Sequence, residues 1–98
     1  MTWVTYRAAL AWQLPETVAL ALRERSLDAV LHYSRRSAEA ALGLVRQAGC
    51  EAEWAGLRQL CLSQDVAAGL SGPAAARIEV AARPDEASLL ALITATTG

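Results

Sequence analysis

The residues best suited to do chemistry in this chain form the segment Ser34-Arg35-Arg36-Ser37. They directly follow an apolar run at 27–33, so they stand where a buried strand must end and a helix must begin. Ser34 or Ser37 can cap that helix, because a short side-chain oxygen accepts a hydrogen bond from an unpaired backbone N–H. The free amides and the helix dipole, with two arginines beside them, favour a carboxylate or a phosphate. The alternative is a plain helix cap with solvated arginines.

A second polar segment, Ser63-Gln64-Asp65, follows another apolar run at 57–62. It can open a helix in the same way, with Ser63 as the cap. The carboxylate of Asp65 would repel an anion, so a cap is the favoured interpretation of this segment.

No other residues carry a recognisable catalytic or metal-binding pattern. His32 lies within the first apolar run, and no Cys, Asp or Glu is spaced with it as a metal set, which favours a hydrogen-bonded core histidine. Cys50 and Cys61 fit neither a CxxC pair nor a common zinc spacing; buried, reduced thiols are favoured over a disulfide. The chain has no GxSxG, GxGxxG or Walker motif, so nucleophile-elbow hydrolases and nucleotide binders have no support, and we expect no metal site.

Composition narrows the class of protein further. The chain has 98 residues, which suits one small domain, and 54% of them are hydrophobic. Its net charge of −1 supplies no field that would attract nucleic acid, so we expect no nucleic-acid partner. It shows neither a signal-peptide pattern nor an apolar stretch of membrane-spanning length. We therefore expect a cytoplasmic protein without a membrane partner.

The elements that would position the polar segments alternate between strand and helix. The β-branched, aromatic and apolar runs predict four strands, at 3–10, 28–33, 57–62 and 77–81. Helices are predicted from Pro15 onward, from Ser34 to a stop at Gly49, over 65–70, and after a cap at Asp85. This order predicts an α/β fold with an open parallel sheet of three to four strands and flanking helices, a truncated flavodoxin-like half of a doubly wound domain.

The predicted topology brings the two polar segments together. Ligands of open parallel sheets bind at the carboxyl ends of the strands. Both helix starts, at 34–37 and 63–65, would lie on that edge. The main functional expectation from the residues themselves is therefore an anion site formed by two helix N-termini on one edge of the sheet.

Four segments taken in order resemble the C-terminal part of uroporphyrinogen-III synthases: YRAA, LPETVALAL, LDAVLHYSRRSAEA and ARPDEASLLALI. The run DAVLHYSRRSAEA is similar to the family's strand followed by an SPRSA helix start. The run LCLSQDVAAGL lies where the family often has IGPxTAxAL. Two departures stand out, because Arg35 replaces the usual proline and Ser63-Gln64 replaces the usual Gly-Pro.

The resemblance implies a cofactor-free enzyme that cyclises the linear tetrapyrrole hydroxymethylbilane to uroporphyrinogen III and inverts its last pyrrole ring. In that family the polycarboxylate substrate lies between two α/β domains and binds through backbone amides at helix starts. By position the substrate-binding residues here would be Ser34, Arg35, Arg36, Ser37, Ser63, Gln64 and Asp65. No catalytic acid or base is implied. Residues 1–98 would form a single α/β domain with a linker strand at 1–12 and a βαβαβα core at 27–98.

Two functional hypotheses follow. The first is a uroporphyrinogen-III synthase homologue or a fragment of one, incomplete as an isolated chain. The second is a non-catalytic α/β module that binds a polycarboxylate or a protein partner. A phospho-receiver lacks support, because no acidic cluster lies near the predicted strand ends. In either case a truncated sheet of three to four strands would expose the unpaired backbone of an edge strand. Such an edge favours a homodimer or a swapped oligomer in which 3–10 pairs across chains.

Overall fold

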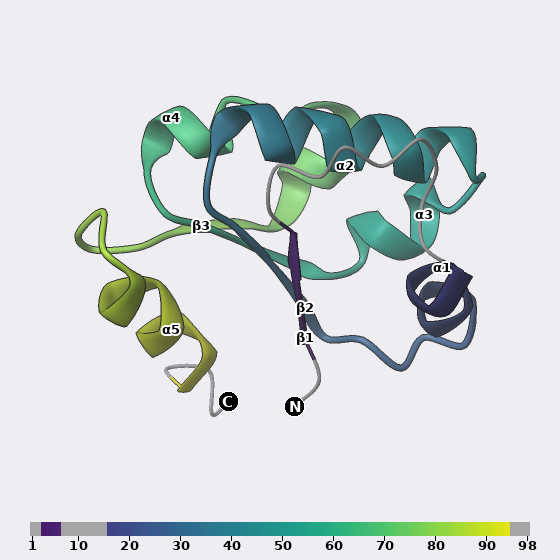
Figure 1. Cartoon of the computed structure of the whole chain (residues 1–98), viewed down its shortest axis with the longest axis horizontal. Helices are drawn as coiled ribbons and strands as arrows, with labels where there is room; N and C mark the ends of the chain where they lie inside the picture. The colour runs from purple at the N-terminus through teal and green to yellow at the C-terminus, as the bar shows by residue number, and fades with distance from the viewer. Residues whose placement is uncertain (1–2, 7–15, 95–98) are drawn as a thin grey trace.

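The sheet has four parallel strands in the order β1-β2-β3-β4, shown in a computed structural model that describes residues 3–6 and 16–94 (Figure 1). The strands are β1 (Trp3–Tyr6), β2 (Ala29–His32), β3 (Arg58–Cys61) and β4 (Ile78–Val80). The predicted open parallel α/β sheet is confirmed. Spatial order follows chain order without a reversal, so the strands wind in one direction, as in one half of a doubly wound sheet.

Helices cover both faces of the sheet. The elements α1 (Glu16–Arg23), α2 (Arg35–Gln47), α3 (Glu51–Ala55) and α4 (Gln64–Ala67) lie on one face. A 3₁₀ helix, η1 (Gly72–Arg77), leads into β4 and packs against α3. The last helix, α5 (Glu86–Thr94), covers the opposite face (Figure 1). The domain is thus a three-layer arrangement with most of its helices on one side.

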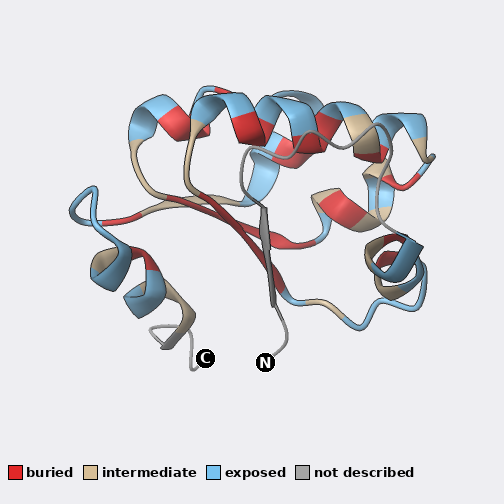
Figure 2. Ribbon diagram, viewed as in Figure 1, coloured by how far each residue is buried: buried red, intermediate tan, exposed pale blue. Residues whose placement is uncertain are grey.

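The core is divided by the sheet, because successive side chains of a strand point to opposite faces. On the α2 face, Val30 packs with Val45 and Trp54. On the α5 face, Leu31 and Leu60 pack with Leu89. All of these side chains are buried, and Figure 2 shows that the two central strands are buried along their length. Each fully buried large apolar side chain stabilises the fold by roughly 1.5–3 kcal/mol relative to exposure.

Local signals explain where most helices begin and end. Gly49 ends α2 with φ +74, the left-handed conformation that glycine adopts at little cost, as predicted. The carboxylate of Asp85 accepts a hydrogen bond from the Ser88 amide at 2.7 Å, which confirms the predicted cap of α5. Pro15, the predicted helix start, lies outside the described residues, and α1 begins at Glu16.

Some elements differ from the sequence-based prediction. Residues 50–56, for which no element was predicted, contain the short helix α3, and its Trp54 is fully buried. The helix predicted at 65–70 is the single turn α4, at Gln64–Ala67. The predicted stop after residue 70 is followed by η1, because Pro73 fixes a φ suited to a first helical turn.

The first strand pairs within its own chain. Trp3 lies in register with Ala29, and Tyr6 with His32, both in parallel orientation. The described part of the expected linker strand at 1–12 is therefore a sheet strand of the same domain, while residues 7–12 lie outside the described residues. Pairing of this segment across two chains stays a prediction.

Candidate anion-binding site at the carboxyl edge of the sheet

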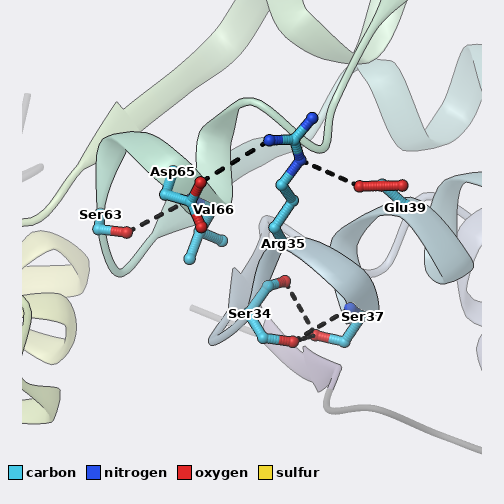
Figure 3. A network of polar contacts seen from close by, with 7 residues as sticks. All are labelled: Ser34, Arg35, Ser37, Glu39, Ser63, Asp65 and Val66. Carbon is cyan, nitrogen blue, oxygen red and sulfur yellow. Dashed lines mark hydrogen bonds and ion pairs between the residues drawn. The ribbon is translucent and has the colours of Figure 1, made fainter.

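The two serines of the first polar segment form the cap of α2 and hydrogen-bond to one another. Ser34 is extended (φ −147, ψ 152), and its Oγ accepts a hydrogen bond from the Ser37 amide at 3.1 Å (Figure 3). The Ser34 hydroxyl donates to Ser37 Oγ at 2.9 Å, and the Ser37 hydroxyl donates to the Ser34 carbonyl at 3.1 Å. Ser37 is fully buried. The Ser37 hydroxyl thus stabilises the helix start and does not face a ligand.

The backbone amides of Arg35 and Arg36 are the groups that the cap leaves unsatisfied. They are the first two residues of α2, where no preceding helical turn offers a carbonyl, and the described residues give them no acceptor. The thirteen residues of α2 add a helix dipole whose positive end lies at these amides. Both arginine side chains are exposed. An anion placed here would meet two N–H donors and positive charge.

The second polar segment caps a much shorter helix. Ser63 is extended (φ −155, ψ 171), and its Oγ accepts a hydrogen bond from the Val66 amide at 3.3 Å. Gln64 and Asp65 are exposed in the first turn of α4. Because α4 has only four residues, its dipole adds little. The favoured interpretation of this segment as a cap agrees with the geometry.

The sheet brings the two segments to one edge, as the predicted topology requires. Strands β2 and β3 are parallel neighbours with His32 in register with Cys61, and each polar segment follows one of them. Arg35 Nη1 lies 3.8 Å from Asp65 Oδ1, so the segments are in ionic contact (Figure 3). Together they form a polar surface, hereafter the rim, made of Ser34, Arg35, Arg36, Ser63, Gln64 and Asp65.

Charges on the rim are unevenly paired. The guanidinium of Arg35 lies between two carboxylates, 3.1 Å from Glu39 and 3.8 Å from Asp65. All three side chains are more than half exposed, so each pair contributes only about 0–1 kcal/mol. Arg36 forms no ion pair within the described part of the chain. Arg36 is therefore the rim cation most open to an external anion.

A glycine that the sequence analysis did not single out fixes how closely α4 approaches α2. A Cβ on Gly69 would lie 2.6 Å from the Arg35 carbonyl oxygen and 3.2 Å from the Ala38 Cβ. Beside this contact, Ala38 packs with Val66 and Leu70. The rim thus depends on a backbone contact that only glycine allows, and no local sequence signal marks that contact.

Polar groups inside the core are structural. The imidazole of His32 is fully buried and hydrogen-bonded to Gln59, which confirms the predicted core histidine. Cys50 and Cys61 are buried free thiols, as predicted, and burial raises the pKa of Cys61 to about 12. A thiol with so high a pKa is a poor nucleophile at neutral pH.

A half-buried ion pair that the sequence analysis missed, between buried Arg58 and partly exposed Glu79, lies on the α5 face. The Arg58 guanidinium donates to both carboxylate oxygens of Glu79, at 2.6 and 2.8 Å, and to the Leu92 carbonyl at 2.7 Å. The Arg58 hydrogen bonds hold the pKa of Glu79 below its ordinary value, and the same contacts raise the pKa of Arg58. Arg58 links β3, β4 and α5, and it lies on the sheet rather than at the rim.

The fold and the rim define a small open α/β domain with a polar carboxyl edge. Comparison of the chain with known protein families, curated proteins and solved structures found no match. Within residues 3–6 and 16–94, no three His, Cys, Asp or Glu side chains gather to hold a metal ion. None of the helices in that part of the chain is long and apolar enough to cross a membrane.

Proposed function

We propose that the chain binds a polycarboxylate at the rim, with the start of α2 as the principal contact. The observation that carries this proposal is the pair of amides of Arg35 and Arg36 that have no acceptor among the described residues, together with the exposed Arg36 side chain, which forms no ion pair in that part of the chain. Carboxylates are favoured at helix N-termini, because the free N–H groups and the dipole both stabilise negative charge.

The finer proposal is that the polycarboxylate is a linear tetrapyrrole and that the chemistry is that of uroporphyrinogen-III synthase. Three of the resembling segments lie where a strand ends and the following helix begins. DAVLHYSRRSAEA spans β2 and the start of α2, LCLSQDVAAGL spans the end of β3 and all of α4, and ARPDEASLLALI follows β4 and spans most of α5. On this proposal, the protein binds the carboxylates of hydroxymethylbilane. The bound substrate is thereby held so that its reactive end lies next to the ring carbon with which it must form a bond. Positioning alone can supply much of the rate enhancement.

The alternative is a non-catalytic module that binds a polycarboxylate or a protein partner. The pairing of Arg35 with Glu39 and Asp65 favours it, because one of the two rim arginines is already neutralised. A surface pocket lined by Leu22, Leu27 and Leu57 lies at the amino-terminal edge of the sheet, away from the rim.

Two measurements test these proposals. Purified chain is incubated with freshly generated hydroxymethylbilane, and type I and type III uroporphyrins are separated after oxidation. Type III above the spontaneous type I background supports the synthase, whereas type I alone excludes it for the isolated chain. Binding is measured separately by titrating the chain into uroporphyrin, an octacarboxylate, and following the fluorescence of the porphyrin.

The binding titration includes a matched pair of variants. Arg36→Ala removes a rim cation that forms no ion pair within the described part of the chain, and Arg23→Ala removes an exposed arginine at the end of α1, which leads to the amino-terminal edge of the sheet. We expect roughly fivefold weaker binding for Arg36→Ala, equivalent to about 1 kcal/mol, and no change for Arg23→Ala. Equal affinities for the two variants and the natural chain would refute binding at the rim, for the enzyme and the module alike.

A further inference from the structure

The buried imidazole of His32 joins three elements of the core. His32 is fully buried at the carboxyl end of β2. Its Nε2 lies 2.7 Å from the Gln59 side-chain oxygen on β3, and the Gln59 amide nitrogen donates to the Trp54 carbonyl of α3 at 2.9 Å. The chain His32–Gln59–Trp54 therefore connects β2, β3 and α3 through side-chain hydrogen bonds.

These contacts assign the proton on the imidazole. The Trp54 carbonyl can only accept, so the Gln59 nitrogen must face it and the Gln59 oxygen must face His32. An amide oxygen cannot donate. His32 Nε2 must therefore carry the hydrogen, which leaves Nδ1 as the unprotonated nitrogen of the neutral ring.

Within residues 3–6 and 16–94, no ion pair involves His32. His32 Nδ1 is buried without a hydrogen-bond partner, and the ring meets Trp54 edge to face with centroids 6.0 Å apart. The titratable residues in register with His32 are Tyr6 on β1 and Cys61 on β3, both ordinarily neutral at mildly acidic pH. Four of the five buried residues of α2 are apolar, namely Ala38, Ala41, Leu42 and Val45, and the fifth, Ser37, donates its hydroxyl to the Ser34 carbonyl.

We infer that His32 makes the core acid-sensitive, because its buried site between β2, β3 and α3 suits only a neutral imidazole. A proton added to Nδ1 creates a buried N–H without an acceptor and places a charge in a buried site. Mild acid therefore shifts the equilibrium toward the unfolded chain, although His32 itself is fully buried.

The lowered pKa of His32 sets the direction in which stability changes with pH. Burial lowers the pKa of His32 below 6.5, and the Gln59 hydrogen bond offsets this only in part. The unfolded chain, with an ordinary histidine, takes up the proton first, so stability falls as the pH drops below 6.5. At pH 5.5 the unfolded state carries about ten protonated histidines for each neutral one, so the unfolding equilibrium constant rises by at most about tenfold, the limit reached when the native imidazole stays neutral.

NMR spectroscopy and urea unfolding test this inference on the natural chain, whose single histidine makes the assignment unambiguous. Nitrogen-15 shifts should place the proton on Nε2 at pH 7.5, and the native imidazole should stay neutral well below pH 6.5. The urea midpoint should fall between pH 7.5 and 5.5, and His32→Gln should lose most of this dependence. If His32→Gln does not fold, the NMR titration of the imidazole in the natural chain tests the inference by itself. A native imidazole that titrates near pH 6.5, or that carries its proton on Nδ1, would overturn the inference.

Discussion

Gly69 lies so close to the carbonyl of Arg35 that a Cβ at position 69 would be 2.6 Å from that oxygen. The contact joins the end of α4 to the first turn of α2, which are the two elements of the rim. Since the oxygen belongs to the backbone, it cannot move aside without shifting the helix. The rim therefore keeps its geometry only while position 69 has no side chain.

We expect Gly69→Ala to destabilise the protein by about 1–3 kcal/mol, the usual cost of overpacking a well-packed site. The same substitution at Gly43 is the control, because no atom lies within 4 Å of a Cβ there and alanine favours a helix. Urea unfolding of the two variants measures the difference. Equal stabilities would show that α4 can move away from α2 at no cost.

Two substitutions at Ser34 separate capping from anion binding. Ser34→Ala removes the acceptor of the Ser37 amide and should cost about 1 kcal/mol of stability. Ser34→Asp keeps an acceptor and suits the helix dipole, so it should retain stability. Its negative charge should nevertheless weaken uroporphyrin binding in the same fluorescence titration. Undiminished binding by Ser34→Asp would place the ligand elsewhere.

Asp65→Asn should strengthen polycarboxylate binding. The change removes a repelling carboxylate and frees the Arg35 guanidinium from one of its two partners. We expect an affinity gain of roughly two- to fivefold with little change in stability, because the ion pair is exposed. Glu24→Gln, on an exposed residue outside the rim, makes the same change in net charge and controls for long-range attraction. An equal gain from both variants would rule out a local effect of Asp65.

The Arg58–Glu79 pair predicts a second, more acidic transition. Its hydrogen bonds hold the pKa of Glu79 below the ordinary value of 4.5, so the folded state keeps the carboxylate ionised where the unfolded chain protonates it. The stability that this pair contributes is present above pH 4.5 and is lost as the pH falls through the lower folded pKa.

Glu79→Gln should cost about 1–3 kcal/mol at pH 7, because it leaves the buried guanidinium of Arg58 without its charged partner. The variant should also lose less stability than the natural chain between pH 4.5 and 3. Urea midpoints over this range, compared with Glu16→Gln on the exposed surface of α1, measure the effect. Parallel pH profiles for the natural chain and Glu79→Gln would contradict the role given to the pair.

Local signals were enough to predict the framework. Alternating apolar runs and caps marked the strand–helix order, and Gly49 and Asp85 identified two helix boundaries. The shared edge of the two polar segments followed from parallel topology. These features were predictable because each depends on residues within a few positions of one another.

Contacts between distant residues were not predictable. Arg58 is buried only because Glu79 and the Leu92 carbonyl, 21 and 34 residues away, reach it from β4 and α5. The pairing of Arg35 with Asp65 likewise depends on how closely Gly69 lets α4 approach α2. No pattern within a single segment encodes such distances. Which charges of the rim form ion pairs is therefore known only from the three-dimensional structure.

The strictly sequential strand order also bears on how the chain folds. Every strand pairs only with the strands before and after it along the chain, so each loop closure spans only the connection between two successive strands. Short closures carry a small entropic cost and lower the contact order, which favours rapid folding for a parallel sheet. The nucleus can then form at β2 and β3 and grow outward toward both edges, one unit at a time.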